Sequence, residues 1–171
     1  MGPSRARVRS FREDEWPTYR RLRLQSLAES PDAFGSTLAR EESMDDDHWR
    51  DRLGRGVGSE ANLPLVAEMN EDAAGLAWGR LEPDPECVRL YQMWVAPPFR
   101  RFGLAAMLLE TVIRWGREAD RKVFELSVSS HNLPAVRLYQ RAGFEPFGTL
   151  TPLRRGSEFL SQTMRLTLDP R

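Results

Sequence analysis

Two consecutive prolines, Pro97 and Pro98, separate a strand-like segment from a helix-like one. Residues 88–95 form an apolar run, whereas residues 104–119 repeat apolar side chains at helical spacing. Proline has no backbone N–H and disrupts a β-ladder, so the strand must end here. Residues 123–129 then alternate as another strand. Because a strand, a helix and a strand in succession form a crossover, we expect these two strands to be parallel.

The rest of the chain also alternates between strand and helix patterns. Residues 6–11 predict a strand and residues 13–29 a helix. A second helix at 44–55 would have Ser43 as its N-cap and would end at Gly54, Gly56 and Gly58. Turn-rich gaps then separate three antiparallel strands at 63–69, 73–81 and 88–95.

After the strand at 123–129, residues 133–142 predict a helix that ends at Gly143, and residues 144–150 and 158–168 predict closing strands. The order is therefore βααβββαβαββ. It predicts an α/β (α+β) fold with a mixed, mostly antiparallel central sheet of about seven strands, flanked by four helices. One parallel βαβ unit lies within it.

The composition is that of an ordinary globular chain. A length of 171 residues predicts a single domain over residues 1–171. The chain has 25 basic and 25 acidic side chains, so its formal net charge is zero. The balanced charge and a mean hydropathy of −0.54 argue against a disordered chain, a membrane span and a broadly basic nucleic-acid binder. Cys87 is the only cysteine, and the segment that follows Met1 has no apolar core for a signal peptide. We therefore expect a cytoplasmic protein without a nucleic-acid or membrane partner.

The turn after the two prolines predicts an anion site. The backbone N–H groups of residues 101–106 have no acceptor within the helix that starts there, and the helix dipole favours negative charge at this end. Gly103 would let a diphosphate approach the main chain, and Ala105 keeps the next turn low. An ordinary turn with a solvated Arg100-Arg101 pair would have the same sequence. A Walker loop does not fit, because the only lysine is Lys122, and the GxGxxG spacing is missing.

A second group of residues follows the strand at 123–129. Asn132 precedes a helix whose first turn contains Pro134, and Tyr139 lies seven residues further, two turns later on nearly the same side. Both side chains can point towards one site. Alternatively, Asn132 is an N-cap and Tyr139 a core aromatic residue.

Together these two segments resemble the GCN5-related N-acetyltransferase (GNAT) superfamily, and the resemblance extends from Leu22 to Leu166. The hallmark [QR]xxGx[GA] is matched by Arg100-Arg101-Phe102-Gly103-Leu104-Ala105, after a VxP at Val95-Ala96-Pro97. The downstream NxxAxxxYxxxGF is matched by Asn132, Ala135, Tyr139, Gly143 and Phe144. Arg101 departs from the pattern, since many relatives have glycine there, but its backbone N–H is retained.

The resemblance implies acetyl-CoA as the acyl donor. Its diphosphate would bind the N–H groups of residues 101–106, and its pantetheine arm would pair with main-chain groups of residues 93–95, where the strand splays from its partner. Asn132 would contact the arm, and Arg100 and Arg137 would approach the phosphates. The implied cofactor-binding residues are Met93, Trp94, Val95, Arg100, Arg101, Phe102, Gly103, Leu104, Ala105, Ala106, Asn132, Ala135 and Tyr139.

The implied reaction is direct attack of an amine on the thioester. A main-chain N–H near Val95 would polarise the carbonyl, and Tyr139 would donate a proton to the departing sulfur. Many relatives have a carboxylate on the strand at 88–95, but this chain has none. Glu68 is the first choice as the base, and Glu82, His131 or a water chain are the alternatives.

The sequence leaves the acceptor open between a small-molecule amine and a peptide amine. Acidic residues at 41–42 and 45–47 would attract a cationic amine or, more simply, complement a helix dipole. Without a carboxylate on the usual strand, a catalytically silent acyl-CoA sensor or protein-interaction module is the alternative function. No metal site is expected, and Cys87 is expected to be an unreactive thiol. A homodimer would be common for the family, with Trp78 or Phe159 at its interface.

Overall fold

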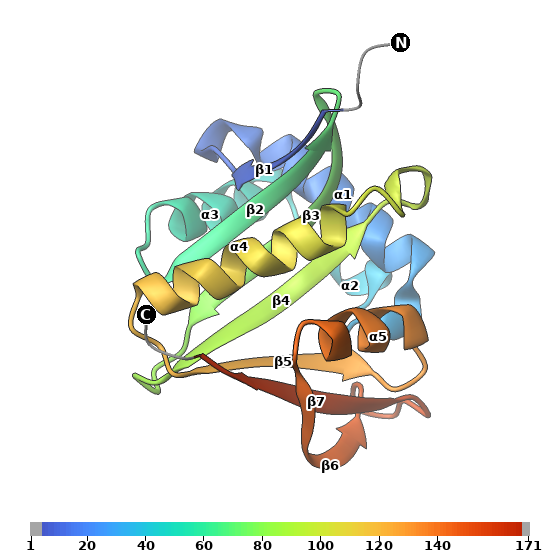
Figure 1. The fold of residues 1–171 in the computed structure, drawn as a ribbon. Coiled ribbons are helices and arrows are strands. Elements are labelled where there is room, and N and C mark those ends of the chain that lie inside the picture. Colours follow the sequence, from blue (N-terminus) through green and yellow to red (C-terminus); the bar gives the residue numbers. More distant parts are fainter. Residues whose placement is uncertain (1–4, 169–171) are drawn as a thin grey trace.

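The computed structural model describes residues 5–168. The first residues of the chain, considered above for a targeting signal, lie outside this range. The described chain forms one seven-stranded sheet in the order β1-β2-β3-β4-β5-β7-β6 (Figure 1). The strands are β1 (Ala6–Ser10), β2 (Asn62–Met69), β3 (Asp72–Leu81), β4 (Cys87–Val95), β5 (Val123–Ser129), β6 (Glu145–Pro152) and β7 (Leu160–Thr167).

The crossover predicted from the two prolines is confirmed. Strands β4 and β5 pair in parallel, and every other pair of neighbouring strands is antiparallel. Helix α4 (Leu104–Glu118) connects them and buries the apolar face that its spacing predicted, including Leu104, Leu108 and Val112. The mixed, mostly antiparallel sheet of the predicted fold is therefore present.

Helices cover both faces of the sheet. Helix α4 crosses the front in Figure 1 and α5 (Leu133–Arg141) lies in front of β5 and β7, while α1 (Trp16–Glu29), α2 (Leu38–Glu42) and α3 (Asp46–Val57) lie behind. Each face has its own hydrophobic core. The core under α4 and α5 contains Val88, Phe124 and Phe144, and the one under α1 and α3 is built around Tyr19 and Trp49.

The segment between α1 and β2 differs from the prediction. It contains an additional short helix, α2, whose N-cap Thr37 accepts a hydrogen bond from the Arg40 N–H. The prediction that Ser43 caps the next helix is wrong: the Asp45 side chain accepts from the His48 N–H at 2.8 Å. The helix ends within the predicted glycine segment: α3 continues through Gly56 to Val57, and Gly58 is its C-cap. A Cβ at Gly56 would lie 2.4 Å from the Trp78 ring, so glycine there allows close packing.

Trp78, considered above for a dimer interface, is partly buried and packs against the core under α1 and α3. Its ring lies 5.7 Å from that of Tyr19, and its indole N–H donates to Asn62 Oδ1 at 2.9 Å. No helix of residues 5–168 combines the length and the apolar character needed to cross a membrane.

Candidate functional site

The parallel strands β4 and β5 separate halfway along their length. Their pairing covers four positions, from Cys87 opposite Val123 to Leu90 opposite Leu126. Beyond these, β4 continues along β3 to Val95, and β5 continues along β7 to Ser129. The main-chain groups of β4 that face β5 are therefore left without a strand partner over residues 91–95. The splayed strand expected from the resemblance is present.

A β-bulge lies where the strands separate. Trp78 pairs with Tyr91 and Leu76 with Trp94, so two residues of β4 lie opposite one residue of β3. One of the two, Gln92, has a left-handed φ of 56°. The buried Tyr19 hydroxyl donates to Gln92 Oε1 at 2.9 Å, which fixes the side chain of the bulge from α1.

The turn before α4 presents free backbone donors. Among the described residues, no hydrogen bond uses the N–H groups of residues 101–106, and the first donor of the helix is Met107 N–H, which bonds Gly103 O at 3.0 Å. Gly103 has φ 81°, and nothing lies within 4 Å of the position that its Cβ would occupy. Arg101 also has a left-handed φ, of 69°, which explains why glycine suits this position. The turn is exposed and suited to an anion.

Helix α5 brings Asn132 and Tyr139 to the β5 side of this opening. Asn132 is the N-cap of α5, because its Oδ1 accepts a hydrogen bond from the Ala135 N–H at 3.3 Å. The N-cap role given above as the alternative for Asn132 therefore describes its Oδ1. Its Nδ2 is not used in any hydrogen bond of the described chain. Tyr139 is buried with its ring edge-on to Phe144, and burial raises the pKa of its hydroxyl. The hydroxyl therefore stays protonated at neutral pH and can act as a donor.

Glu29 is a site residue that the sequence did not reveal. It ends α1, and its Oε2 accepts from the Trp94 indole N–H at 2.9 Å and from Arg100 Nη2 at 2.8 Å. Burial opposes ionisation here, but the hydrogen bonds from Ser30, Trp94 and Arg100 outweigh it and lower the pKa of Glu29 to about 2. Arg100 Nε also donates to Val95 O, so this side chain is held along β4. Only tertiary structure brings these residues together.

The contacts of Glu68 disfavour it as a base. Glu68 lies on β2, two strands from β4, which corresponds to about 10 Å of strand spacing. Arg7 bonds one of its oxygens at 2.6 Å and Arg9 the other at 2.6 Å. Burial would raise the pKa of this carboxyl, but the two guanidinium groups outweigh it, and the pKa lies below the usual value.

Glu82 and His131, the alternative proton acceptors, are not enclosed by guanidinium groups of the described residues as Glu68 is. Glu82 follows β3 and accepts a hydrogen bond from the Tyr91 hydroxyl at 2.7 Å, and Tyr91 directly precedes the bulge. His131 is an exposed loop residue whose ring packs edge-on against Phe159. Cys87 is buried, and burial raises the pKa of its thiol, as expected for an unreactive cysteine.

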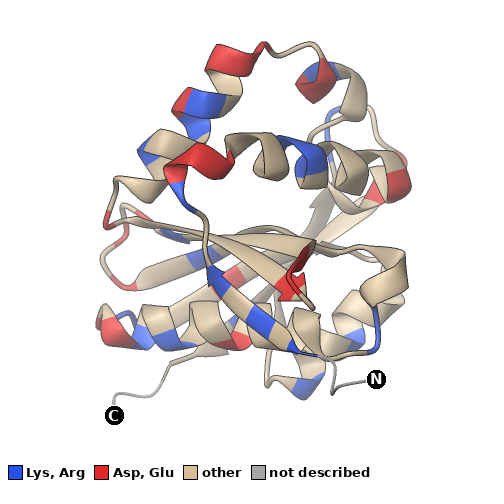
Figure 2. Cartoon of the chain, turned by 90° about the horizontal axis from the view of Figure 1, so that it is seen from above, with Lys and Arg blue, Asp and Glu red and all other residues tan. Residues whose placement is uncertain are grey.

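The acidic residues at 41–47 do not form a common patch. Asp45 caps α3, Asp46 pairs with Arg20 at 3.2 Å, and Asp47 pairs with Arg50 at 2.6 Å. Figure 2 shows acidic and basic residues intermingled along the helices behind the sheet. These three aspartates therefore complement the helix and its basic neighbours and do not form a patch that would attract a cationic amine.

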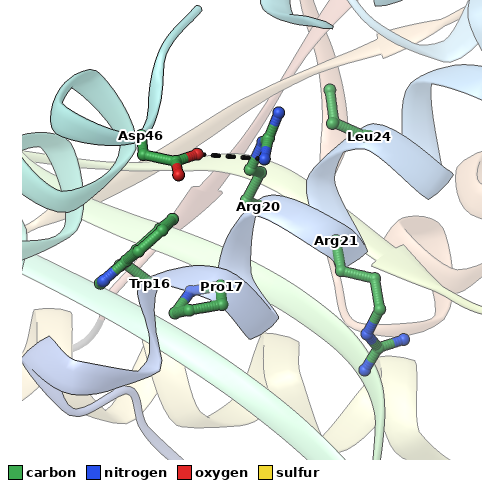
Figure 3. Close-up of a pocket in the computed structure, with 6 residues that line it drawn as sticks. All are labelled: Trp16, Pro17, Arg20, Arg21, Leu24 and Asp46. Carbon is green, nitrogen blue, oxygen red and sulfur yellow. Dashed lines mark hydrogen bonds and ion pairs between the residues drawn. The ribbon is translucent and has the colours of Figure 1, made fainter.

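A pocket of about 230 Å³ lies between α1 and α3 but does not border the splayed strands. The residues that line it are Trp16, Pro17, Arg20, Arg21, Leu24 and Asp46 (Figure 3). None of these residues belongs to β4 or β5. A second pocket, of about 410 Å³, lies where β4 and β5 begin and includes Glu82 and Glu125.

Comparison with known proteins gives one consistent family. Residues 9–144 match the model of the "Acetyltransferase (GNAT) family". An N-acetyltransferase of Methanocaldococcus jannaschii is 32% identical over 86 residues, which cover 47% of this chain and 38% of that protein. The mycothiol acetyltransferase of Thermobifida fusca is 30% identical over 148 residues, 81% of this chain and 43% of that protein. The chain thus spans less than half the length of these two relatives.

Solved structures share the fold at low sequence identity. A putative acetyltransferase of Salmonella typhimurium, solved with acetyl-CoA, superposes with a TM-score of 0.79 at 19% identity, covering 98% of this chain and 96% of that one. A spermidine N-acetyltransferase of Vibrio cholerae, solved with CoA and spermine, gives 0.78 at 16% identity, covering 95% of each chain.

Proposed function

The chain belongs to the GNAT acetyltransferase family, and from this premise we propose that it transfers the acetyl group of acetyl-CoA to a primary amine of a small molecule or peptide. The observation that carries the proposal is the row of free N–H groups at residues 101–106, beside a strand whose edge is open from Tyr91 to Val95. An anionic group and an extended amide-containing arm together satisfy both features.

The residues present fit such a cofactor. The space beside Gly103 is open, and its positive φ turns the neighbouring N–H groups into one concave row. Phe102 and Leu104–Ala106 complete this row, and Met93, Trp94 and Val95 offer the main-chain groups for the arm. Asn132 contributes its unused Nδ2, and Ala135 leaves space beside it. Arg100 would reach a phosphate only by leaving Glu29 and Val95 O.

When bound, acetyl-CoA supplies an activated acetyl thioester. The N–H groups of β4 near the bulge and Val95 would donate hydrogen bonds to the carbonyl oxygen, which would favour attack by the amine. The new N–C bond forms as the C–S bond breaks. Tyr139 would donate its proton to the departing sulfur and regain one from solvent, and the raised pKa of its hydroxyl means that this proton is present at neutral pH.

The amine must also lose a proton, and we propose Glu82 as the acceptor. Glu82 lies level with the start of β4, where its N–H donates to Cys87 O, so a proton from the bulge would reach it through the Tyr91 hydroxyl, which donates to its carboxylate and belongs to a residue that is 38% exposed. Glu68 lacks this access, since both of its oxygens are occupied by Arg7 and Arg9.

The test is thiol release from acetyl-CoA over a panel of polyamines, amino acids, aminoglycosides and peptides. Turnover with any acceptor supports the proposal. Glu82→Gln should lower kcat at least tenfold without changing the KM for acetyl-CoA, whereas Glu68→Gln should mainly lower the unfolding free energy. Tight binding of acetyl-CoA, no turnover over the panel and no effect of Tyr139→Phe would instead identify a sensor.

A further inference from the structure

A buried ion cluster lies between α1, α2 and α3. Arg23 is 4% exposed, and its Nε and Nη2 donate to the two oxygens of Glu41 at 2.9 and 2.7 Å. Arg52 Nη1 donates to Glu41 Oε2 at 3.3 Å. Burial would raise the pKa of Glu41, but the hydrogen bond from Arg23 and the charges around it keep that pKa below the usual value. Two guanidinium groups therefore share one carboxylate, and the cluster has a net charge of +1.

The guanidinium group of Arg52 is held in place but remains accessible. It lies over the ring of Trp49, with Cζ 5.6 Å from the centroid, and over Tyr19 at 5.9 Å. Its side chain is 27% exposed, whereas both rings are buried. Its Nε and Nη2 make no hydrogen bond with any residue from 5 to 168. Stacking and the Glu41 bond thus orient a guanidinium edge whose remaining donors are free.

Two neighbouring donors are buried without a partner. Within the described chain, neither Arg23 Nη1 nor the Trp49 indole N–H has a hydrogen-bond acceptor. A buried donor without a partner costs about 1–3 kcal/mol. Both unmet groups are donors, and the cluster has excess positive charge, so a negatively charged acceptor at the accessible edge of Arg52 would complement its charge. A carboxylate has this chemistry and pairs well with a guanidinium.

The cluster is one aromatic ring away from the bulge. Tyr19 contacts Arg52 through its ring and Gln92 through its hydroxyl. An acceptor that bridged Arg52 and the bulge would therefore span the length of the Tyr19 side chain, with a carboxylate at one end and an amine at the other.

Building on the proposed acetyl transfer, we infer that the acceptor is an amino acid-type molecule, whose carboxylate binds the accessible edge of Arg52 while its amine reaches the bulge. This makes Arg52 a specificity residue. A purely cationic polyamine, which the acidic residues of this segment would suggest, does not fit a cluster of net positive charge.

The test compares acids with their amides. The protein with CoA bound is titrated calorimetrically with α-amino acids and with ω-amino acids of two to six carbons, each against its carboxamide, and thiol release is measured with the same pairs. We expect at least one acid to bind tenfold or more tightly than its amide. Arg52→Gln should remove this preference with little change for the amide, and Arg52→Lys should restore only part of it.

Arg50→Gln is the matched control. Arg50 lies on the same helix, stacks on Trp16 at 5.1 Å and pairs with Asp47, yet it is not part of the cluster. This variant should keep the preference. Equal binding of every acid and its amide, or equal effects of the Arg50 and Arg52 variants, would overturn the inference. An acid preference without any thiol release would support the carboxylate site and count against acetyl transfer.

Discussion

Replacing Gly103 by glutamate tests the cofactor site with a calculable effect. Gly103 has φ 81°, and its Cβ position is open, so the new side chain meets no atom of the protein. The cost to folding is therefore the left-handed conformation alone, about 1–2 kcal/mol. The carboxylate would lie beside the free N–H groups of residues 101–106, where it would repel a diphosphate.

The loss of binding follows from the electrostatics of an exposed site. Two unit charges 4 Å apart repel by about 1 kcal/mol in water and about 4 kcal/mol at an effective dielectric constant of 20. This turn lies at the surface, so an intermediate value of at least about 2 kcal/mol applies. It corresponds to a rise of roughly 30-fold in the Kd for CoA.

The assay is calorimetric titration with CoA, together with thermal unfolding to measure stability. Gly148→Glu is the control, because Gly148 has φ 72° and open space around its Cβ position but lies on the edge strand β6. Both variants should lose similar stability, and only Gly103→Glu should lose CoA. A folded Gly103→Glu protein that binds CoA like its parent, or an equal loss in Gly148→Glu, would refute the placement.

Three further substitutions test other parts of the structure. Tyr139→Phe should lower kcat about 10- to 100-fold in steady-state thiol release, because the proton donor is lost. The KM for acetyl-CoA should stay unchanged, because this hydroxyl makes no hydrogen bond with the described residues. An unchanged kcat would exclude Tyr139 as the acid. Arg101→Gly should raise the unfolding free energy by about 0.5–1 kcal/mol in urea titrations, since relief of a left-handed φ exceeds the entropy cost of glycine; destabilisation would contradict the backbone geometry. The hydrogen bond from Arg9 lowers the pKa of Glu15 to about 2, so its stabilisation is full above the unfolded value of 4.5 and is lost as the pH falls towards 2. Glu15→Gln should flatten the pH dependence of stability in that window, and an identical acid transition would refute this ion pair.

The features of the site that could be predicted from the sequence are those that depend on residues adjacent in the chain. Pro97 and Pro98 end β4, and a helix that starts at Leu104 must leave its first N–H groups free whatever surrounds it. The bounds of β5, Val123–Ser129, and the N-cap role of Asn132 follow from equally local patterns.

Where local signals competed, sequence could not decide. Ser43 and Asp45 are both good N-caps two residues apart, and the outcome depended on α2, a helix too short to have a periodic pattern. Gly54, Gly56 and Gly58 all resemble a helix end, and α3 ends at the last of them; the packing of Trp78 of β3 against Gly56 could not be seen in the sequence. Gln92 has no feature that marks a bulge, since a bulge is a property of the pairing between β3 and β4.

The charges between residues 41 and 47 show most clearly why the acceptor side escaped prediction. The side chains of Glu41 and Asp47 look equivalent in sequence, but Glu41 is 3% exposed and contacts two guanidinium groups, whereas Asp47 is 84% exposed and forms an i,i+3 pair. The electrostatic effect of a carboxylate depends on the cations that tertiary structure brings to it. Here Arg23 and Arg52 come from two different helices and exceed the charge of Glu41. An acidic segment therefore contributes to a locally positive cluster, and this charge is the basis on which we propose an acceptor that carries a carboxylate as well as an amine.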